Sequence, residues 1–130
     1  MKVYDRVMKL SCLLFAVAGC VVAAAGDSPF ACDMKALTPV VRKHHFEVVT
    51  PAVRKLVKGS KELPDGFAFE LPADSAAIQL AAEWASNERL CCPFLEITMR
   101  IERERGRFWL QLTGRERTKE FIHVEFARWL

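Results

Sequence analysis

Two adjacent cysteines carry the clearest chemical character in this chain. Cys91 and Cys92 stand in the stretch Glu88-Arg89-Leu90-Cys91-Cys92-Pro93-Phe94. Thiolates are ligands for thiophilic metal ions such as copper, zinc and mercury. Neighbouring cysteines close a disulfide on each other only with strain, because the intervening peptide must be cis or distorted, and a strained disulfide is easily reduced. The pair therefore indicates a metal site or a redox switch more than a structural crosslink.

The proline that follows the pair determines where the sulfur atoms lie. Pro93 lacks an N–H and pushes the preceding residue out of helical geometry, so a helix entering this stretch ends at about Cys91. We therefore expect both thiols at a helix end, side by side and accessible from outside. The partial negative charge of a helix C-terminus disfavours thiolates, and Arg89 is the nearest cation that offsets it.

The first 25 residues have the layout of a secretory signal peptide. Three basic residues lie within Met1 to Lys9, and an uncharged apolar run follows from Leu10 to Ala25. Cleavage after Ala25 predicts a secreted or periplasmic protein. Two alternatives stay open: an uncleaved membrane anchor, and lipidation at Cys20 in a lipobox-like Val-Ala-Gly-Cys, which would tether a lipoprotein to the membrane. Cleavage is preferred because the chain stays apolar after Cys20.

Export changes both the charge and the number of cysteines. Loss of residues 1–25 leaves 16 basic and 15 acidic residues, a net charge of +1, which argues against a nucleic-acid partner. Three cysteines remain: Cys32, Cys91 and Cys92. An odd number in an oxidising compartment predicts a leftover thiol, a thiol shared with a partner, or a metal site that uses all three. Residues 26–37 have no clear period and predict a flexible lead-in that lets Cys32 reach the pair.

A kinked helix is expected at the start of the folded domain. Thr38 can cap it, apolar residues recur at helical spacing up to about residue 58, and Pro51 should kink or split it. His44 and His45 lie on this helix as a tempting pair of metal ligands. Adjacent helical residues point about 100° apart, so the two cannot easily bind one ion, and we interpret them as half-buried polar surface.

The remaining elements follow from local patterns. Alternating apolar residues predict strands at 67–71, 95–102 and 108–113, and helical patterns predict helices at 75–91 and from 115 to the C-terminus. Asp74 is a good N-cap for the first of these helices. Trp84 lies two turns before Cys91 on the same side of that helix, where packing is its expected role. His123 is expected to be exposed to solvent.

These elements predict a single α+β domain over residues 38–130, in the order α-β-α-β-β-α. A right-handed crossover would make the 67–71 and 95–102 strands parallel, with the 108–113 strand between them and antiparallel to both. The expectation is thus a three-stranded mixed or antiparallel sheet with helices packed on one face.

The chain from Leu63 to Phe121 resembles a group of small bacterial proteins of unassigned function that share a Glu-Arg-x-Cys-Cys-Pro-Phe core followed by a hairpin. The residues that match this core are Glu88, Arg89, Cys91, Cys92, Pro93 and Phe94. The resemblance implies a compact domain and no particular activity.

We expect a site that binds a thiophilic metal ion outside the cytoplasm, with Cys91, Cys92 and Cys32 as ligands and Arg89 stabilising the thiolates. The alternative is a thiol redox or sensor protein in which two of these cysteines cycle between dithiol and disulfide. A third hypothesis makes the cysteines purely structural, packed as small hydrophobes. No nucleophile, base and orienting group can be placed together, which disfavours an enzyme.

Overall fold

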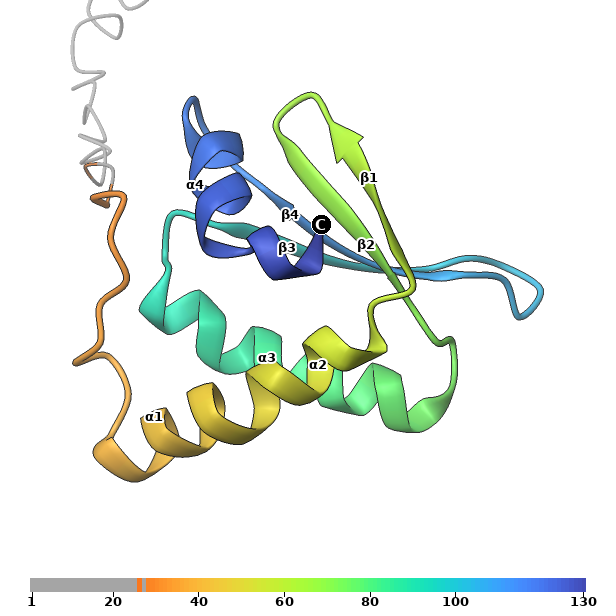
Figure 1. Cartoon of the computed structure of the whole chain (residues 1–130), viewed down its shortest axis with the longest axis horizontal. Helices are drawn as coiled ribbons and strands as arrows, with labels where there is room; N and C mark the ends of the chain where they lie inside the picture. The colour runs from red at the N-terminus through yellow and green to blue at the C-terminus, as the bar shows by residue number, and fades with distance from the viewer. Residues whose placement is uncertain (1–25, 27) are drawn as a thin grey trace, which may run out of the picture.

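The computed structural model describes residues 26 and 28–130, so the predicted signal peptide and the lipidation alternative at Cys20 lie outside the described residues. Figure 1 shows a sheet that crosses the molecule, with two long helical segments beneath it and a shorter C-terminal helix near one end. In the described part of the chain, no helix has both the length and the apolar character needed to cross a membrane.

The N-terminal helical segment is continuous but wound more widely in its middle. It comprises α1 (Pro39–His44), the π-helical turn η1 (His45–Val49) and α2 (Thr50–Leu56). In the wide turn, the N–H of Thr50 donates to the carbonyl of His45, five residues earlier. The interruption expected at Pro51 therefore takes the form of this wide turn, which ends two residues before the proline that cannot donate a helical hydrogen bond.

The sheet has four antiparallel strands in the order β1-β2-β4-β3. They are β1 (Gly59–Leu63), β2 (Gly66–Leu71), β3 (Glu96–Ile101) and β4 (Phe108–Thr113). The chain is α+β as predicted, but the three-stranded sheet and the order α-β-α-β-β-α were wrong. With the wide turn counted as part of the first helix, the order is α-β-β-α-β-β-α.

The strand missed by the sequence analysis is β1. Its residues, Gly-Ser-Lys-Glu-Leu, have low strand propensity and are exposed along almost their whole length, so no apolar alternation marks them. Gly59 and Ser60 are residue types that favour turns. The segment becomes a strand because the turn at 64–65 folds it back onto β2, where Ser60 pairs with Phe69.

Two further helices lie against one face of the sheet. They are α3 (Ser75–Cys91) and α4 (Thr118–Glu125), the latter followed by the 3-10 turn η2 (Ala127–Trp129). The expected single helix to the C-terminus therefore ends at residue 125. The predicted cap of α3 is present, since Asp74 accepts a hydrogen bond from the N–H of Ala77 at 2.9 Å. His123 is exposed, as predicted.

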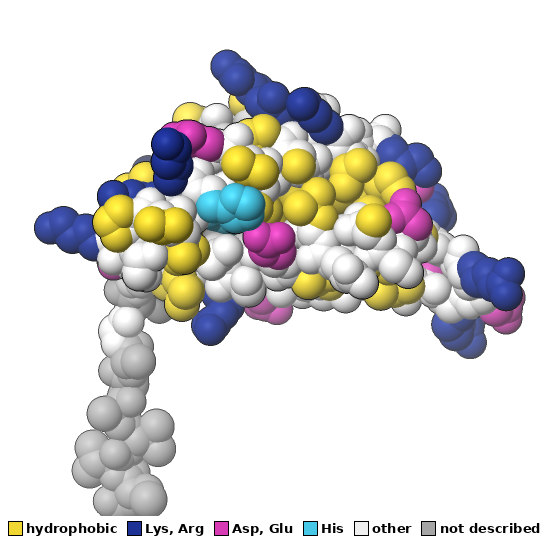
Figure 2. All heavy atoms as spheres, turned by 90° about the horizontal axis from the view of Figure 1, so that it is seen from below, with side chains coloured by type: hydrophobic (Ala, Val, Ile, Leu, Met, Phe, Trp, Pro, Cys, Tyr) yellow, Lys and Arg dark blue, Asp and Glu magenta, His cyan; other side chains and the backbone are white. Residues whose placement is uncertain are grey.

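An aromatic cluster holds the helices to the sheet. Trp84 on α3 is fully buried, with its ring centroid 5.3 Å from that of Trp129 and 6.1 Å from that of Phe126. The ring of Trp129 in turn lies 5.4 Å from Phe69 on β2. Such rings bury a large apolar area, so the expected packing role of Trp84 agrees with its place in this core. Figure 2 views the helical underside, where hydrophobic side chains are interspersed with charged ones.

Candidate metal and thiol site

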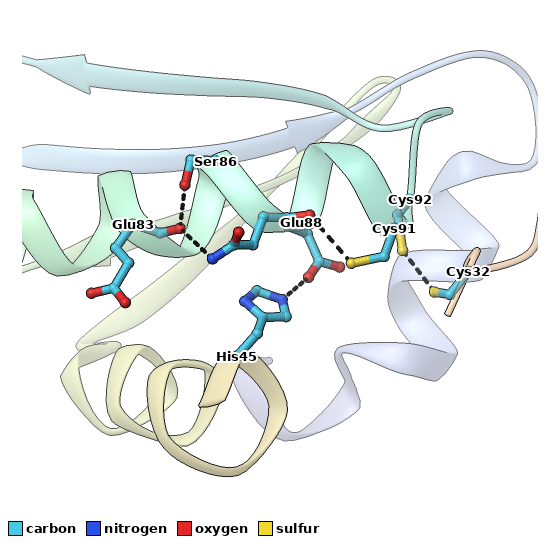
Figure 3. Close-up of polar contacts among 8 residues, drawn as sticks. Cys32, His45, Glu83, Ser86, Glu88, Cys91 and Cys92 are labelled. Carbon is cyan, nitrogen blue, oxygen red and sulfur yellow. Dashed lines mark hydrogen bonds and ion pairs between the residues drawn. The ribbon is translucent and has the colours of Figure 1, made fainter. Parts of the chain in front are cut away.

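The end of α3 positions the two adjacent cysteines. The helix ends at Cys91, as Pro93 predicts, and the N–H of Cys92 closes its last turn by donating to the carbonyl of Glu88 at 2.8 Å. The N–H of Leu95 then donates to the carbonyl of Cys92 at 3.0 Å, which turns the chain toward β3. This sharp exit directs the two neighbouring thiols to different partners (Figure 3).

The segment before α1 is held against this helix end, which gives Cys32 a defined place. The N–H of Asp33 donates to the carbonyl of Cys91 at 2.6 Å. The ring of Phe30 lies 5.1 Å from that of Phe94. The guanidinium of Arg115, a residue that follows β4, lies 4.3 Å from the centroid of the Phe30 ring. Backbone pairing, aromatic packing and a cation–π contact thus fix the lead-in on both sides of Cys32.

The three sulfur atoms form a pair and a separate single thiol. The Sγ atoms of Cys32 and Cys92 lie 2.6 Å apart, whereas Cys91 donates its thiol hydrogen to the carbonyl of Asn87 at 3.2 Å. Cys91 and Cys92 are 0% and 1% exposed, so the expectation that both sulfurs are accessible from outside was wrong. Pro93 turns the backbone, but the lead-in and the helices cover the side chains. Cys32 is exposed.

A buried imidazole and a buried carboxylate lie beside these thiols. Nε2 of His45 is 2.8 Å from Oε2 of Glu88, and both side chains are almost completely removed from solvent. His44 points instead to the surface, where it meets Glu83 at 3.1 Å. The two histidines do diverge, as helical geometry requires. The interpretation of His45 as half-buried surface was wrong, because η1 turns it into the core.

Sequence signals for this pair existed but were weak. His45 precedes the buried residues Val49 and Val53 at intervals of four, so it lies on the apolar stripe of its helix. Glu88 follows Trp84 by four residues on the buried row of α3. Each is a polar residue at a core position, and such residues normally need a partner. No local pattern connects the two residues, because they are 43 residues apart in the chain.

His45, Glu88 and Cys91 lie close enough to hold a metal ion. They offer one nitrogen, one oxygen and one sulfur, all within 4.8 Å of one another and all buried. Bond lengths of about 2.0 Å to nitrogen and about 2.3 Å to sulfur would place tetrahedral zinc ligands about 3.3–3.8 Å apart, so the 2.8 Å contact between His45 and Glu88 would have to open by about 0.5 Å to admit the ion. In addition, Nδ1 of His45 is buried without a hydrogen-bond partner, an unusual cost for a core side chain.

The environment makes the three thiols chemically different. Burial, followed by the charge of Glu88, raises the pKa of Cys91 to about 11. The hydrogen bond to Cys32, with burial and Glu88 in addition, raises the pKa of Cys92 as well. The same hydrogen bond lowers the pKa of Cys32, against the opposing effects of burial and Glu88. Cys32 is therefore the thiol that ionises most readily.

The predicted supporting residues Arg89, Glu88 and Trp84 lie in different places around the thiols. Arg89 is exposed and lines a groove between α3 and β3, and the charge that acts on all three thiols is the carboxylate of Glu88. Trp84 stacks near His45, with ring centroids 6.4 Å apart and an interplanar angle of 26°. The structure thus groups Cys32 with Cys92, and Cys91 with His45 and Glu88.

Comparisons with protein-family models, with curated proteins and with solved structures found no match.

Proposed function

We propose that the protein binds a thiophilic metal ion through Cys91, His45 and Glu88, with the Cys32–Cys92 pair beside the site. The observation that carries this proposal is the buried group of one sulfur, one nitrogen and one oxygen donor within 4.8 Å. A buried carboxylate and imidazole placed beside a thiol are costly unless they are paired or bind a cation. A divalent ion would compensate for the charge of Glu88 and of an ionised Cys91.

Zinc suits this donor set best. It accepts thiolate, imidazole and carboxylate in one tetrahedral site, whereas Cu(I) and Hg(II) prefer sulfur more strongly. Three protein ligands leave the fourth position of a tetrahedral zinc site to a water molecule or another small ligand. Binding requires the Cys91 thiol to lose its proton, so metal uptake releases protons and strengthens as the pH rises.

A titration of the reduced chain with Zn(II), in competition with a chromophoric chelator, tests the proposal. We expect one ion per chain, with affinity lowered about tenfold or more by His45→Gln or Cys91→Ala. His44→Gln is the matched control, because His44 is the adjacent residue but lies on the surface. Cys12 and Cys20 are present in every variant, so any binding by them cancels. Absence of stoichiometric binding, or equal effects of the two histidine variants, contradicts the proposal.

A second candidate function is thiol–disulfide exchange by Cys32 and Cys92. The supporting observation is their Sγ separation of 2.6 Å, together with the lowered pKa of Cys32, the exposed member of the pair. In a substrate disulfide, the Cys32 thiolate attacks one sulfur and releases the other half as a thiolate, which takes the proton of Cys92. The Cys92 thiolate then attacks the Cys32 sulfur, releases the second half and closes the Cys32–Cys92 disulfide. Two electrons pass to the substrate.

Mass spectrometry after incubation with oxidised glutathione separates the candidates. Exchange predicts a mixed disulfide at Cys32 that resolves to a Cys32–Cys92 bond, accumulation of the mixed disulfide in Cys92→Ala, and normal resolution in Cys91→Ala. Metal binding alone predicts none of these products. If neither metal nor glutathione reacts in the folded chain, the cysteines are structural. Export would favour the oxidised pair, because disulfides persist outside the cytoplasm.

A further inference from the structure

We infer that β3 is a homodimer interface, at which two copies of this chain pair their edge strands in antiparallel fashion about a two-fold axis at Thr98. β3 is the last strand of the sheet, next to β4 alone. An open edge strand of six residues is a template for pairing with another strand. The occupant that fits this edge is a second β3, for reasons of hydrogen-bond pattern, charge and apolar surface.

The hydrogen-bond pattern shows which backbone groups face the open edge. The N–H of Glu102 donates to the carbonyl of Arg107 at 2.9 Å, and the register continues through Arg100 opposite Trp109 and Thr98 opposite Gln111. In an antiparallel ladder every second residue bonds to its neighbour strand, so these even-numbered residues of β3 bond to β4. The N–H and C=O groups of Ile97 and Met99 therefore point away from the sheet. Two-fold pairing at Thr98 places Ile97 opposite the partner's Met99. The outward N–H and C=O groups of these residues then form hydrogen bonds between the two copies.

The charges of β3 select this register. Glu96 and Arg100 are exposed on the face of the sheet away from the helices, and at four residues apart they are about 13 Å from each other, too far to pair within one strand. Pairing at Thr98 brings each Glu96 opposite the Arg100 of the other copy. Pairing at Met99 would instead set Glu96 opposite Glu102. Opposite charges in cross-strand positions stabilise a sheet and like charges destabilise it.

The apolar side of the edge also lacks a cover. An open groove of about 530 Å³ runs between α3 and β3. Five of its seven lining residues are apolar (Ala82, Ala85, Leu95, Ile97 and Met99), and the other two are Ser86 and Arg89. A two-fold axis normal to the sheet keeps the helical faces of both copies on the same side, so the two grooves meet and cover each other. The opposite edge, β1, offers no such apolar row, because all its residues but the last are exposed and mostly polar. Hydrogen bonds, charges and apolar contact thus agree on one self-complementary interface.

Charge reversal tests this interface by sedimentation equilibrium of the full chain. We expect a dimer for the native chain and a dissociation constant raised at least about tenfold in Glu96→Arg and in Arg100→Glu, because each single variant sets like charges opposite each other. The double variant, with both reversals, should dimerise again, and an equimolar mixture of the two single variants should form a heterodimer. A monomeric native chain, or self-association that ignores these reversals, overturns the inference.

Amide hydrogen exchange supplies a readout that does not depend on the variants. The amides of Ile97 and Met99 should exchange slowly at high protein concentration and faster on dilution. The amides of Thr98 and Arg100, which already bond to β4, should stay protected throughout and serve as internal controls. Fast, concentration-independent exchange at Ile97 and Met99 would contradict pairing at this edge. Glu96 and Arg100 are both exposed, so the circular dichroism of the two charge-reversal variants should match that of the native chain.

Discussion

Glu88 is the residue on which the candidate site depends. It accepts a hydrogen bond from His45. Its charge adds to the effect of burial in raising the pKa of Cys91, and to the effects of the hydrogen bond to Cys32 and of burial in raising the pKa of Cys92. A carboxylate that is 5% exposed would be strongly destabilising without such a partner. A buried hydrogen-bonded pair of this kind adds little net stability, but removal of one member leaves the other unsatisfied. Glu88 therefore matters to stability through the partner that it satisfies.

Replacement of Glu88 should therefore cost far more than replacement of a surface glutamate on the same helix. We expect Glu88→Ala to lower the free energy of unfolding by about 3 kcal/mol, because His45 loses its partner and a cavity remains. Glu83→Ala removes the exposed partner of His44 and should change it by close to zero. Urea denaturation of the two variants measures the difference. Similar effects at both positions would mean that the buried pair has no special energetic role.

The raised pKa of Cys91 predicts a loss of stability in alkaline solution. In the unfolded chain the thiol ionises near its ordinary pKa of 9.0, whereas in the folded chain it does so at about 11. The folded state therefore holds the proton more tightly, and this contribution to stability is complete below pH 9 and lost as the pH rises through 11. The free energy of unfolding should fall over this range more in the native chain than in Cys91→Ala. A parallel decline in both proteins would contradict the burial of this thiol.

At the scale of elements, the sequence predicts a helix boundary correctly where a single residue begins or ends the helix by its own geometry. Asp74 and Pro93 bound α3, and the alternation before and after the 102–107 turn marks β3 and β4, so these elements agree with the sequence prediction. The wide turn η1 was not predicted, although a proline at position 51 calls for some local adjustment. His45 lies in this turn and contacts Glu88 on α3. No local sequence pattern predicts that contact.

The lead-in segment should set the rate at which Cys32 and Cys92 react with each other. Its docking through Phe30 holds the two sulfur atoms together, which acts as a high effective concentration. Phe30→Ala removes the ring contact with Phe94. In quenched-flow experiments, the rate of closure of the Cys32–Cys92 disulfide should fall by about tenfold. Met34→Ala alters an exposed side chain of the same segment and should leave the rate unchanged. Equal rates in both variants would show that Cys32 reacts from a free segment.

At the scale of the whole molecule, the features that the sequence analysis missed are the ones made by distant segments. β1 exists because it pairs with β2, and the buried pair exists because the first helix packs on α3. β1 is a polar segment, and His45 and Glu88 are polar residues. None of them has a local sequence preference that predicts its pairing or its burial. The thiols were expected at the surface for the same reason, since the segment that covers them lies about 60 residues earlier in the chain.

That separation makes oxidation of the pair a strong determinant of global stability. Cys32 and Cys92 are 60 residues apart, so a disulfide between them restricts the unfolded chain and should add up to about 4 kcal/mol to the free energy of unfolding. The oxidised native chain should therefore melt well above the reduced one by circular dichroism. Cys32→Ser should abolish this difference, whereas Cys91→Ser should retain it, because Cys91 bonds to Asn87 rather than to another sulfur. A redox-dependent melting temperature in Cys32→Ser, or its loss in Cys91→Ser, would assign the disulfide to a different pair and contradict the arrangement of sulfur atoms described above.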